Sequence, residues 1–158
     1  MSTKDRIKEL LEESRIVLPG VQALLGFQFA AYLSDSYAKL PQASQTAHSA
    51  ALVLLLVSMV LLMAPAPFHR IACGGEPTPL ADKVGVGFVL AALPPLALAV
   101  ALDFYIVLQK VSGDGRLSAW AGGASALVCL LLWFGLPLAA RGRPAGAGDR
   151  SQRASARS

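Results

Sequence analysis

The chain has 158 residues, of which 54% are hydrophobic and 15% are charged, and it carries a formal charge of +4. This charged fraction is well below the roughly 25% of soluble proteins, and the apolar residues come in continuous runs, which argues against a soluble globular domain. The cations lie beside those runs, where membrane orientation explains them, so we expect no nucleic-acid partner.

Four runs without a charged residue cover most of the chain. They are residues 16–34, 49–68, 84–102 and 117–140. A helix rises about 1.5 Å per residue and the hydrocarbon core is about 30 Å thick, so each run can cross a bilayer. The sequence therefore predicts an all-α polytopic membrane protein with one domain over residues 16–140. We expect its four transmembrane helices at about 16–34, 48–67, 84–108 and 117–140.

The first run is preceded by a segment that predicts a short amphipathic helix. In residues 1–15, Ile7, Leu10 and Leu11 share one face at helical spacing. We expect a cytoplasmic lead-in that lies along the membrane surface or extends the first span. Pro19-Gly20 falls in the first turns of the run and predicts a break or bend there.

Two glutamines lie within the first run. Gln22 and Gln28 are six positions apart, so on a helix they face different neighbours. Amides in membrane helices commonly hydrogen-bond to other helices, and we expect both to act as structural contacts between helices.

The second run is bounded by a histidine and by two prolines. His48 begins it, and we expect this side chain to be solvated at the interface. Pro65 and Pro67 predict the end of the helix, followed by a loop over residues 68–79 that is rich in glycine and proline. His69 and Arg70 then fall at the membrane interface, where anchoring to lipid is the expected role.

The third and fourth runs carry helix-modifying residues. Pro94-Pro95 predicts a kink, with the freed carbonyls of Leu90 and Ala91 bonded to neighbouring helices or water. The fourth run contains small residues four apart, which allow another backbone to approach closely. These residues are Ala119, Gly122, Gly123 and Ala126.

Asp103 is the carboxylate that most needs an explanation, because a charge within a span is costly and tends to face the bundle or water. One interpretation is a proton or cation site near the Pro94-Pro95 kink. The other is a carboxylate near the headgroups that pairs with Lys110 or Arg116. The sequence leaves both open.

The distribution of cations predicts the orientation. With four spans, eleven of the 14 Lys and Arg residues fall on the side of the two termini and the second loop, and three fall on the other side. The positive-inside rule places the richer side in the cytoplasm, including a disordered basic tail at residues 141–158. The bias towards Ala, Arg and Gly suggests a bacterial genome, so we expect the bacterial inner (plasma) membrane.

Three segments of the chain resemble a family of small bacterial membrane proteins of unknown function, the domain of unknown function 6328. Residues 13–27, ESRIVLPGVQALLGF, resemble the opening of that family. Residues 65–70, PAPFHR, are similar to its Pro-x-x-His-Arg element, and residues 133–138, WFGLPL, match its closing element. Members often have threonine where Pro19 stands. The resemblance implies four spans and no known activity, and it draws attention to Arg15, Gln22, His69 and Arg70 as a cytoplasmic-side cluster.

No motif in the sequence predicts catalysis, a cofactor or a metal site. We therefore expect a non-enzymatic accessory or interaction protein whose surroundings are the lipid bilayer and whose partner is a second copy or another membrane protein. The alternative is a small homo-oligomeric channel or transporter for protons or cations that uses Asp103. A lipid-modifying enzyme centred on His69 and Arg70 is a third, weaker hypothesis.

Overall fold

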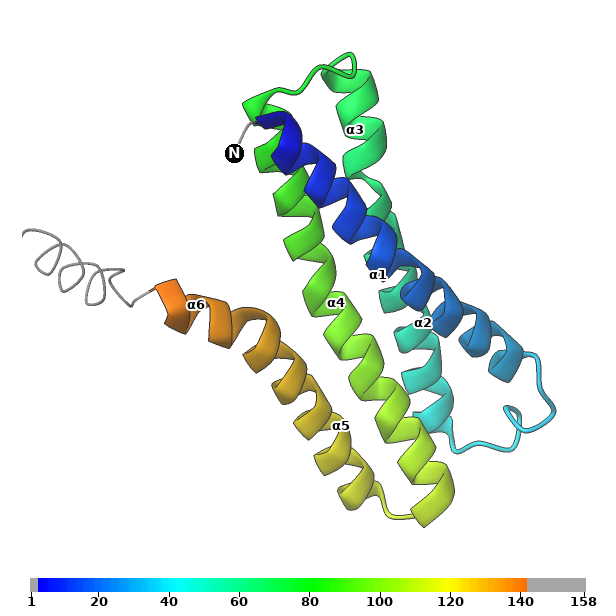
Figure 1. Cartoon of the computed structure of the whole chain (residues 1–158). Coiled ribbons are helices and arrows are strands. Elements are labelled where there is room, and N and C mark those ends of the chain that lie inside the picture. Colours follow the sequence, from blue (N-terminus) through cyan, green and yellow to red (C-terminus); the bar gives the residue numbers. More distant parts are fainter. Residues whose placement is uncertain (1–2, 142–158) are drawn as a thin grey trace, which may run out of the picture.

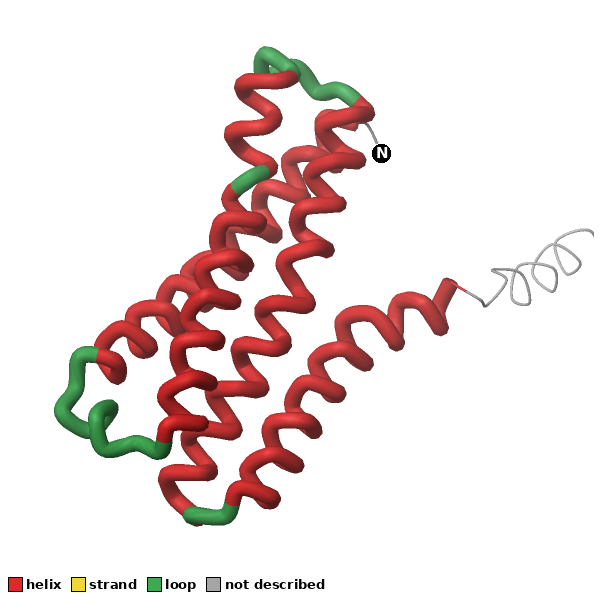
Figure 2. Tube along the Cα trace, turned by 180° about the vertical axis from the view of Figure 1, so that it is seen from behind, coloured by secondary structure: helices red, strands yellow, loops and turns green. Residues whose placement is uncertain are grey.

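The computed structural model describes residues 3–141, except for the side chains of Thr3, Ser14 and Arg141, and these residues fold entirely into helices and short connections (Figures 1 and 2). The predicted tail at 141–158 lies, apart from Arg141, outside the described residues. The all-α class predicted from the apolar runs is confirmed for the described part of the chain.

Helix α1 (Thr3–Tyr32) joins the predicted lead-in and the first apolar run into one element of 30 residues. The break expected at Pro19-Gly20 is absent, because the fixed φ of proline is compatible with a helix and only one backbone hydrogen bond is lost. Ile7 and Leu10 are buried, and the Leu10 side chain packs against Gly85 of α4. The lead-in therefore belongs to the bundle.

Helices α2 (Gln42–Met63) and α3 (Pro65–Ala72) are separated by the single residue Ala64. The loop predicted from residue 68 was wrong in its first part, since residues 68–72 are helical. A proline in the first turn of a helix loses no intrahelical bond, so Pro65 begins a new helix after ending the previous one. The true loop is short and covers residues 73–78.

Helix α4 (Pro79–Ser112) is longer than the predicted third span. The Thr78 hydroxyl accepts a hydrogen bond from the Ala81 amide (3.2 Å) at its start, and Gly113 ends it in the left-handed conformation with φ 70°. The helix continues through Pro94 and Pro95 without interruption. Near the prolines, the Ser58 hydroxyl donates a hydrogen bond to the Ala92 carbonyl (3.1 Å). This carbonyl is next to those of Leu90 and Ala91, for which we expected partners.

The last helical rod consists of α5 (Gly115–Leu130), η1 (Leu131–Gly135) and α6 (Leu136–Arg141). The Asp114 carboxylate caps its start by accepting from the Arg116 and Leu117 amides. The η1 segment is a π-helical turn, in which the Leu136 amide donates to the Leu131 carbonyl. This widening lies just before Pro137, whose missing amide interrupts the regular ladder.

The helices run up and down along one axis. Figures 1 and 2 show α1, α2 and α4 packed together, while the last rod starts beside the end of α4 and diverges from the other helices towards α6. The apolar core lies between α1, α2 and α4, with Trp133 of η1 packed against it. The buried core residues are Val21, Leu55, Leu62, Ala92, Leu96 and Ala99.

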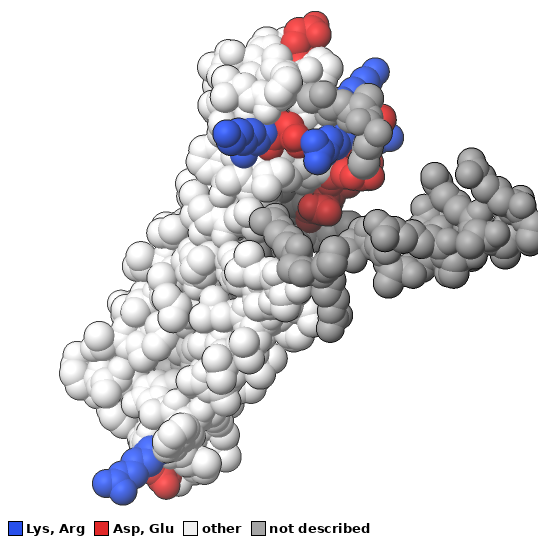
Figure 3. Space-filling model, turned by 90° about the vertical axis from the view of Figure 1, so that its left-hand side faces the viewer, with Lys and Arg blue, Asp and Glu red and all other residues white. Residues whose placement is uncertain are grey.

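Three helical segments are long and apolar enough to span a membrane: Gln42–Ala72, Pro79–Ser112 and Gly115–Ala140. Helix α1 is not among them, although it extends from one end of the bundle to the other (Figure 1). The face drawn in Figure 3 carries its charged side chains at the two ends of an otherwise uncharged shaft. These features indicate a membrane protein.

Candidate functional site

A side-chain hydrogen bond inside the bundle joins α1 to α4. The Gln28 amide nitrogen donates a hydrogen bond to the Asp103 carboxylate, and the Gln28 side chain is buried, with 5% exposed. Asp103 lies nine residues before the end of α4, about 13 Å along a helix with a rise of 1.5 Å per residue. The carboxylate therefore lies within the candidate span.

His48 of α2 completes this cluster. Its Nε2 lies 3.0 Å from the Gln28 carbonyl oxygen, and since a carbonyl can only accept, Nε2 carries the hydrogen. The ring is 5% exposed and lies beside the rings of Tyr37 and Tyr32, at centroid distances of 5.4 and 6.2 Å. Our expectation of a solvated His48 was wrong, because Tyr32 at the end of α1 and Tyr37 in the loop over residues 33–41 pack against it. We call Gln28, His48 and Asp103 the buried polar cluster.

The expected ion pairs of Asp103 are not formed. Among the described residues neither Lys110 nor Arg116 pairs with it, and the ion pair that does form joins Arg6 to Asp82 (3.7 Å) at the opposite end of the bundle. The partner that the structure gives Asp103 is instead the Gln28 amide of α1. The carboxylate is thus held by Gln28, whose backbone carbonyl in turn contacts His48 of α2.

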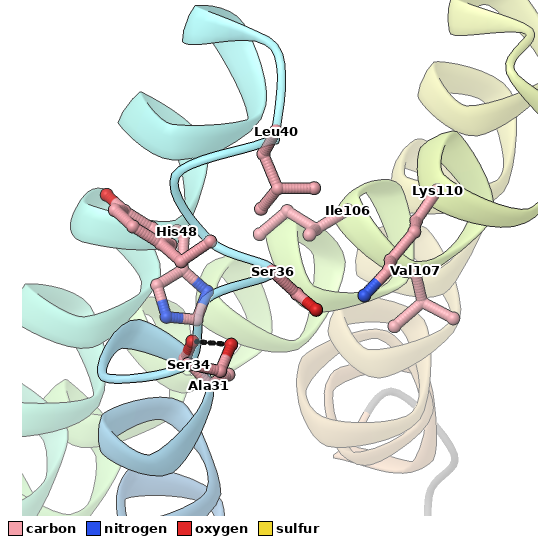
Figure 4. Close-up of a pocket in the computed structure, with 9 residues that line it drawn as sticks. Ala31, Ser34, Ser36, Leu40, His48, Ile106, Val107 and Lys110 are labelled. Carbon is pink, nitrogen blue, oxygen red and sulfur yellow. Dashed lines mark hydrogen bonds between the residues drawn. The ribbon is translucent and has the colours of Figure 1, made fainter.

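A pocket of about 210 Å³ lies next to the buried polar cluster, at the end of the bundle where the chain turns at residues 33–41. His48 of α2 and Lys110 of α4 lie on different sides of it, with Ser36 between them (Figure 4). The Ser34 hydroxyl donates its hydrogen to the Ala31 carbonyl (2.7 Å), so this hydrogen is already used within α1 and the turn that follows it. Polar groups therefore extend from the cluster to the end of the bundle.

The opposite direction is closed by apolar side chains. From the buried polar cluster towards the N-terminal end, the interior is filled by the core that contains Val21, Leu55 and Leu96. A proton or cation at Asp103 has no polar route through this core. The described residues also contain no group of three His, Cys, Asp or Glu side chains that could hold a metal ion.

The structure brings together three of the four residues in the predicted cytoplasmic-side cluster. Arg15 of α1 and both His69 and Arg70 of α3 line one pocket of about 380 Å³, which we call the basic pocket. Gln22 is not among its lining residues; it is exposed, and the described residues give its amide no hydrogen-bond partner. Of the two glutamines, only Gln28 is seen to link helices within the described chain.

Comparison with known proteins gives one match. No curated protein and no solved structure matches this chain. The model of a family of unknown function (DUF6328) matches residues 3–137, which is most of the chain and includes nearly all of the three segments on which the resemblance rested. The chain therefore belongs to this family of unknown function, DUF6328.

Proposed function

We propose that the protein is a non-enzymatic accessory or interaction protein of the bacterial plasma membrane, crossing it four times with both termini in the cytoplasm. Support for a fourth crossing comes from α1, which lies alongside the apolar helices α2 and α4 over the length of the bundle. The orientation is supported by the excess of Lys and Arg in the first half of α1, in the segment between α2 and α4, and in the sequence after residue 140.

The short connections support a role without catalysis. The described helices are joined by residues 33–41, 64, 73–78 and 113–114, which leave no extramembrane domain between them. Two hydrogen bonds of the buried polar cluster and one from Ser58 to the Ala92 carbonyl join different helices. A protein built in this way would act on other molecules by binding them at its membrane-facing surface.

The observation that carries the proposal is an open apolar cleft along α4. It has a volume of about 410 Å³ and separates α1 from the last rod. A Cβ atom added at Gly20, on its α1 wall, would meet no other atom within 4 Å, so a helix backbone can approach closely there. The remaining lining residues are Val17, Val21, Leu24, Leu96, Val100, Cys129 and Trp133. The proposed occupant is a transmembrane helix of another membrane protein.

The test combines native mass spectrometry of the protein in patches of its own lipid with site-specific photo-crosslinking. We expect a stoichiometric foreign subunit, and a photoreactive residue at Gly20 that crosslinks to that same subunit. Val60 of α2 serves as the matched control, because it is exposed on the bundle surface and does not line the cleft. A complex that contains only lipid, or equal crosslinking from both positions, would contradict the proposal.

The buried polar cluster favours a second candidate, a homo-oligomeric proton or cation channel or transporter. A carboxylate and an imidazole inside a span are the groups that such proteins use. Because the apolar core closes the route within one chain, the path would have to be formed between chains. This candidate requires a proton or cation flux in liposomes that Asp103→Asn reduces; a flux that is absent, or unchanged by the substitution, excludes it.

A further inference from the structure

The basic pocket combines two chemically different linings. Arg15, His69 and Arg70 supply its polar wall from α1 and α3. The remaining lining side chains are apolar: Leu11, Leu18, Leu62, Met63, Ala66 and Pro67. A ligand that satisfies both walls must carry a polar head and an apolar body.

The polar wall is cationic and has no internal counter-charge. Among the described residues neither Arg15 nor Arg70 forms an ion pair with a carboxylate. His69 adds a ring nitrogen, Nδ1, that is buried and has no hydrogen-bond partner within the described chain. His69 also lines the pocket, and leaving this nitrogen unbonded is unfavourable.

The two guanidinium groups and the histidine define the head that fits. A guanidinium presents a planar fork that matches phosphate oxygens, and Nδ1–H of a histidine donates to the same acceptor. The pocket lies where α2 passes into α3, in the half of the bundle that contains the start of α1 (Figure 1). In the proposed membrane placement, this is the level of the lipid headgroups.

We infer that the basic pocket binds one anionic phospholipid of the adjacent leaflet, with its phosphate held by Arg15, Arg70 and His69 and its chain laid along the apolar wall. The α1 and α3 segments are far apart in sequence, so a shared headgroup links the start of the bundle to the helix after Ala64. This inference rests on the membrane placement of the proposed function and needs no protein partner.

The test is a lipid titration of the purified full chain in detergent, followed by native mass spectrometry. We expect one bound phosphatidylglycerol, preferred at least about tenfold over phosphatidylcholine. The double substitution Arg15→Gln/Arg70→Gln should lower the affinity for phosphatidylglycerol at least about tenfold. The control Lys4→Gln/Lys8→Gln removes the same charge from the same end without touching the pocket, and its affinity should stay within about twofold of the unsubstituted protein.

The contributions of guanidinium geometry and of the lipid chain are measured separately. Arg15→Lys/Arg70→Lys keeps the charge and removes the forks, so it should lower the affinity several-fold while circular dichroism shows an unchanged helix content. Inorganic phosphate at millimolar concentration should not displace the lipid, because it leaves the apolar wall unfilled. Any of three results would overturn the inference. The first is an equal loss of lipid affinity in Arg15→Gln/Arg70→Gln and in the control Lys4→Gln/Lys8→Gln. The others are displacement of the lipid by free phosphate and equal affinity for phosphatidylglycerol and phosphatidylcholine. Because no partner protein is present, failure of the accessory role would leave this result unaffected.

Discussion

At the scale of single residues, the hydrogen bond between Gln28 and Asp103 determines how α1 is held against α4. Replacing Gln28 with leucine leaves a carboxylate without its partner inside the bundle. An unsatisfied buried group costs about 1–3 kcal/mol, and measured polar contacts in membrane proteins lie at the lower end of that range. We expect Gln28→Leu to lower the free energy of unfolding by about 1–3 kcal/mol.

Gln22 provides the matched control for this prediction. It lies on the same helix and carries the same amide, but it is exposed and has no hydrogen-bond partner in the described chain. Gln22→Leu should change the stability by less than about 0.5 kcal/mol. Unfolding in mixed micelles, followed by circular dichroism, measures both variants. If both substitutions lower the free energy of unfolding equally, the Gln28–Asp103 hydrogen bond does not contribute to stability.

The sequence allowed only part of this cluster to be predicted. Asp103 stands out because it interrupts an apolar segment, and Gln28 was expected to contact another helix. Gln28 and Asp103 are 75 positions apart, and their pairing depends on how α1 and α4 are rotated against each other. The pattern of apolar residues in a single helix does not determine that rotation. His48 was missed, although Gln28 and His48 flank the same loop and so lie at a similar depth.

At the scale of helices, Gly122 sets the distance between α4 and α5. A Cβ atom at this position would come within 2.8 Å of the Ala101 carbonyl oxygen and 3.3 Å of the Tyr105 Cβ. Because the obstructing atom belongs to the backbone, the helices would have to separate. We expect Gly122→Ala to lower the free energy of unfolding by about 1–3 kcal/mol, as overpacked cores do.

The adjacent Gly123 is the control, since a Cβ atom there would meet no other atom within 4 Å. Gly123→Ala should be neutral or stabilising by up to about 1 kcal/mol, because alanine favours the helix more than glycine does. Thermal unfolding of the two variants in the same detergent compares them directly. A stable Gly122→Ala protein would show that α5 does not pack closely on α4.

Helix boundaries were the part of the elements that sequence predicted least well. Pro65 and Pro67 were interpreted as a stop, but a proline that ends one helix can begin the next, as at α3. The break that was considered at Pro19 does not occur, since α1 continues through it, and α4 likewise continues through Pro94 and Pro95. Each proline removes one backbone donor, and the remaining hydrogen bonds of the helix are enough to keep it continuous. The long apolar segments themselves were predicted well because each persists over many turns.

At the scale of the whole molecule, the account depends on where the two ends of the bundle lie. The basic pocket, the loop over residues 73–78 and the start of α1 lie at one end, and the buried polar cluster lies nearer the other. From the excess of cations at the first end, the sequence predicts that this end faces the cytoplasm. It did not predict that the last rod diverges from the other helices, because the run of apolar residues in one helix does not determine its angle to the next (Figure 1).

Accessibility of engineered cysteines in intact cells tests the account most directly. After Cys73 and Cys129 are replaced with serine, a single cysteine is placed at Ser36, in the loop at one end, or at Glu76, in the loop at the other. With a membrane-impermeant maleimide, we predict labelling from outside at position 36, and labelling at position 76 only after the membrane is opened. Labelling of position 76 in intact cells, or of both positions at once, would contradict the four-span topology and the placement of the basic pocket in the cytoplasmic leaflet.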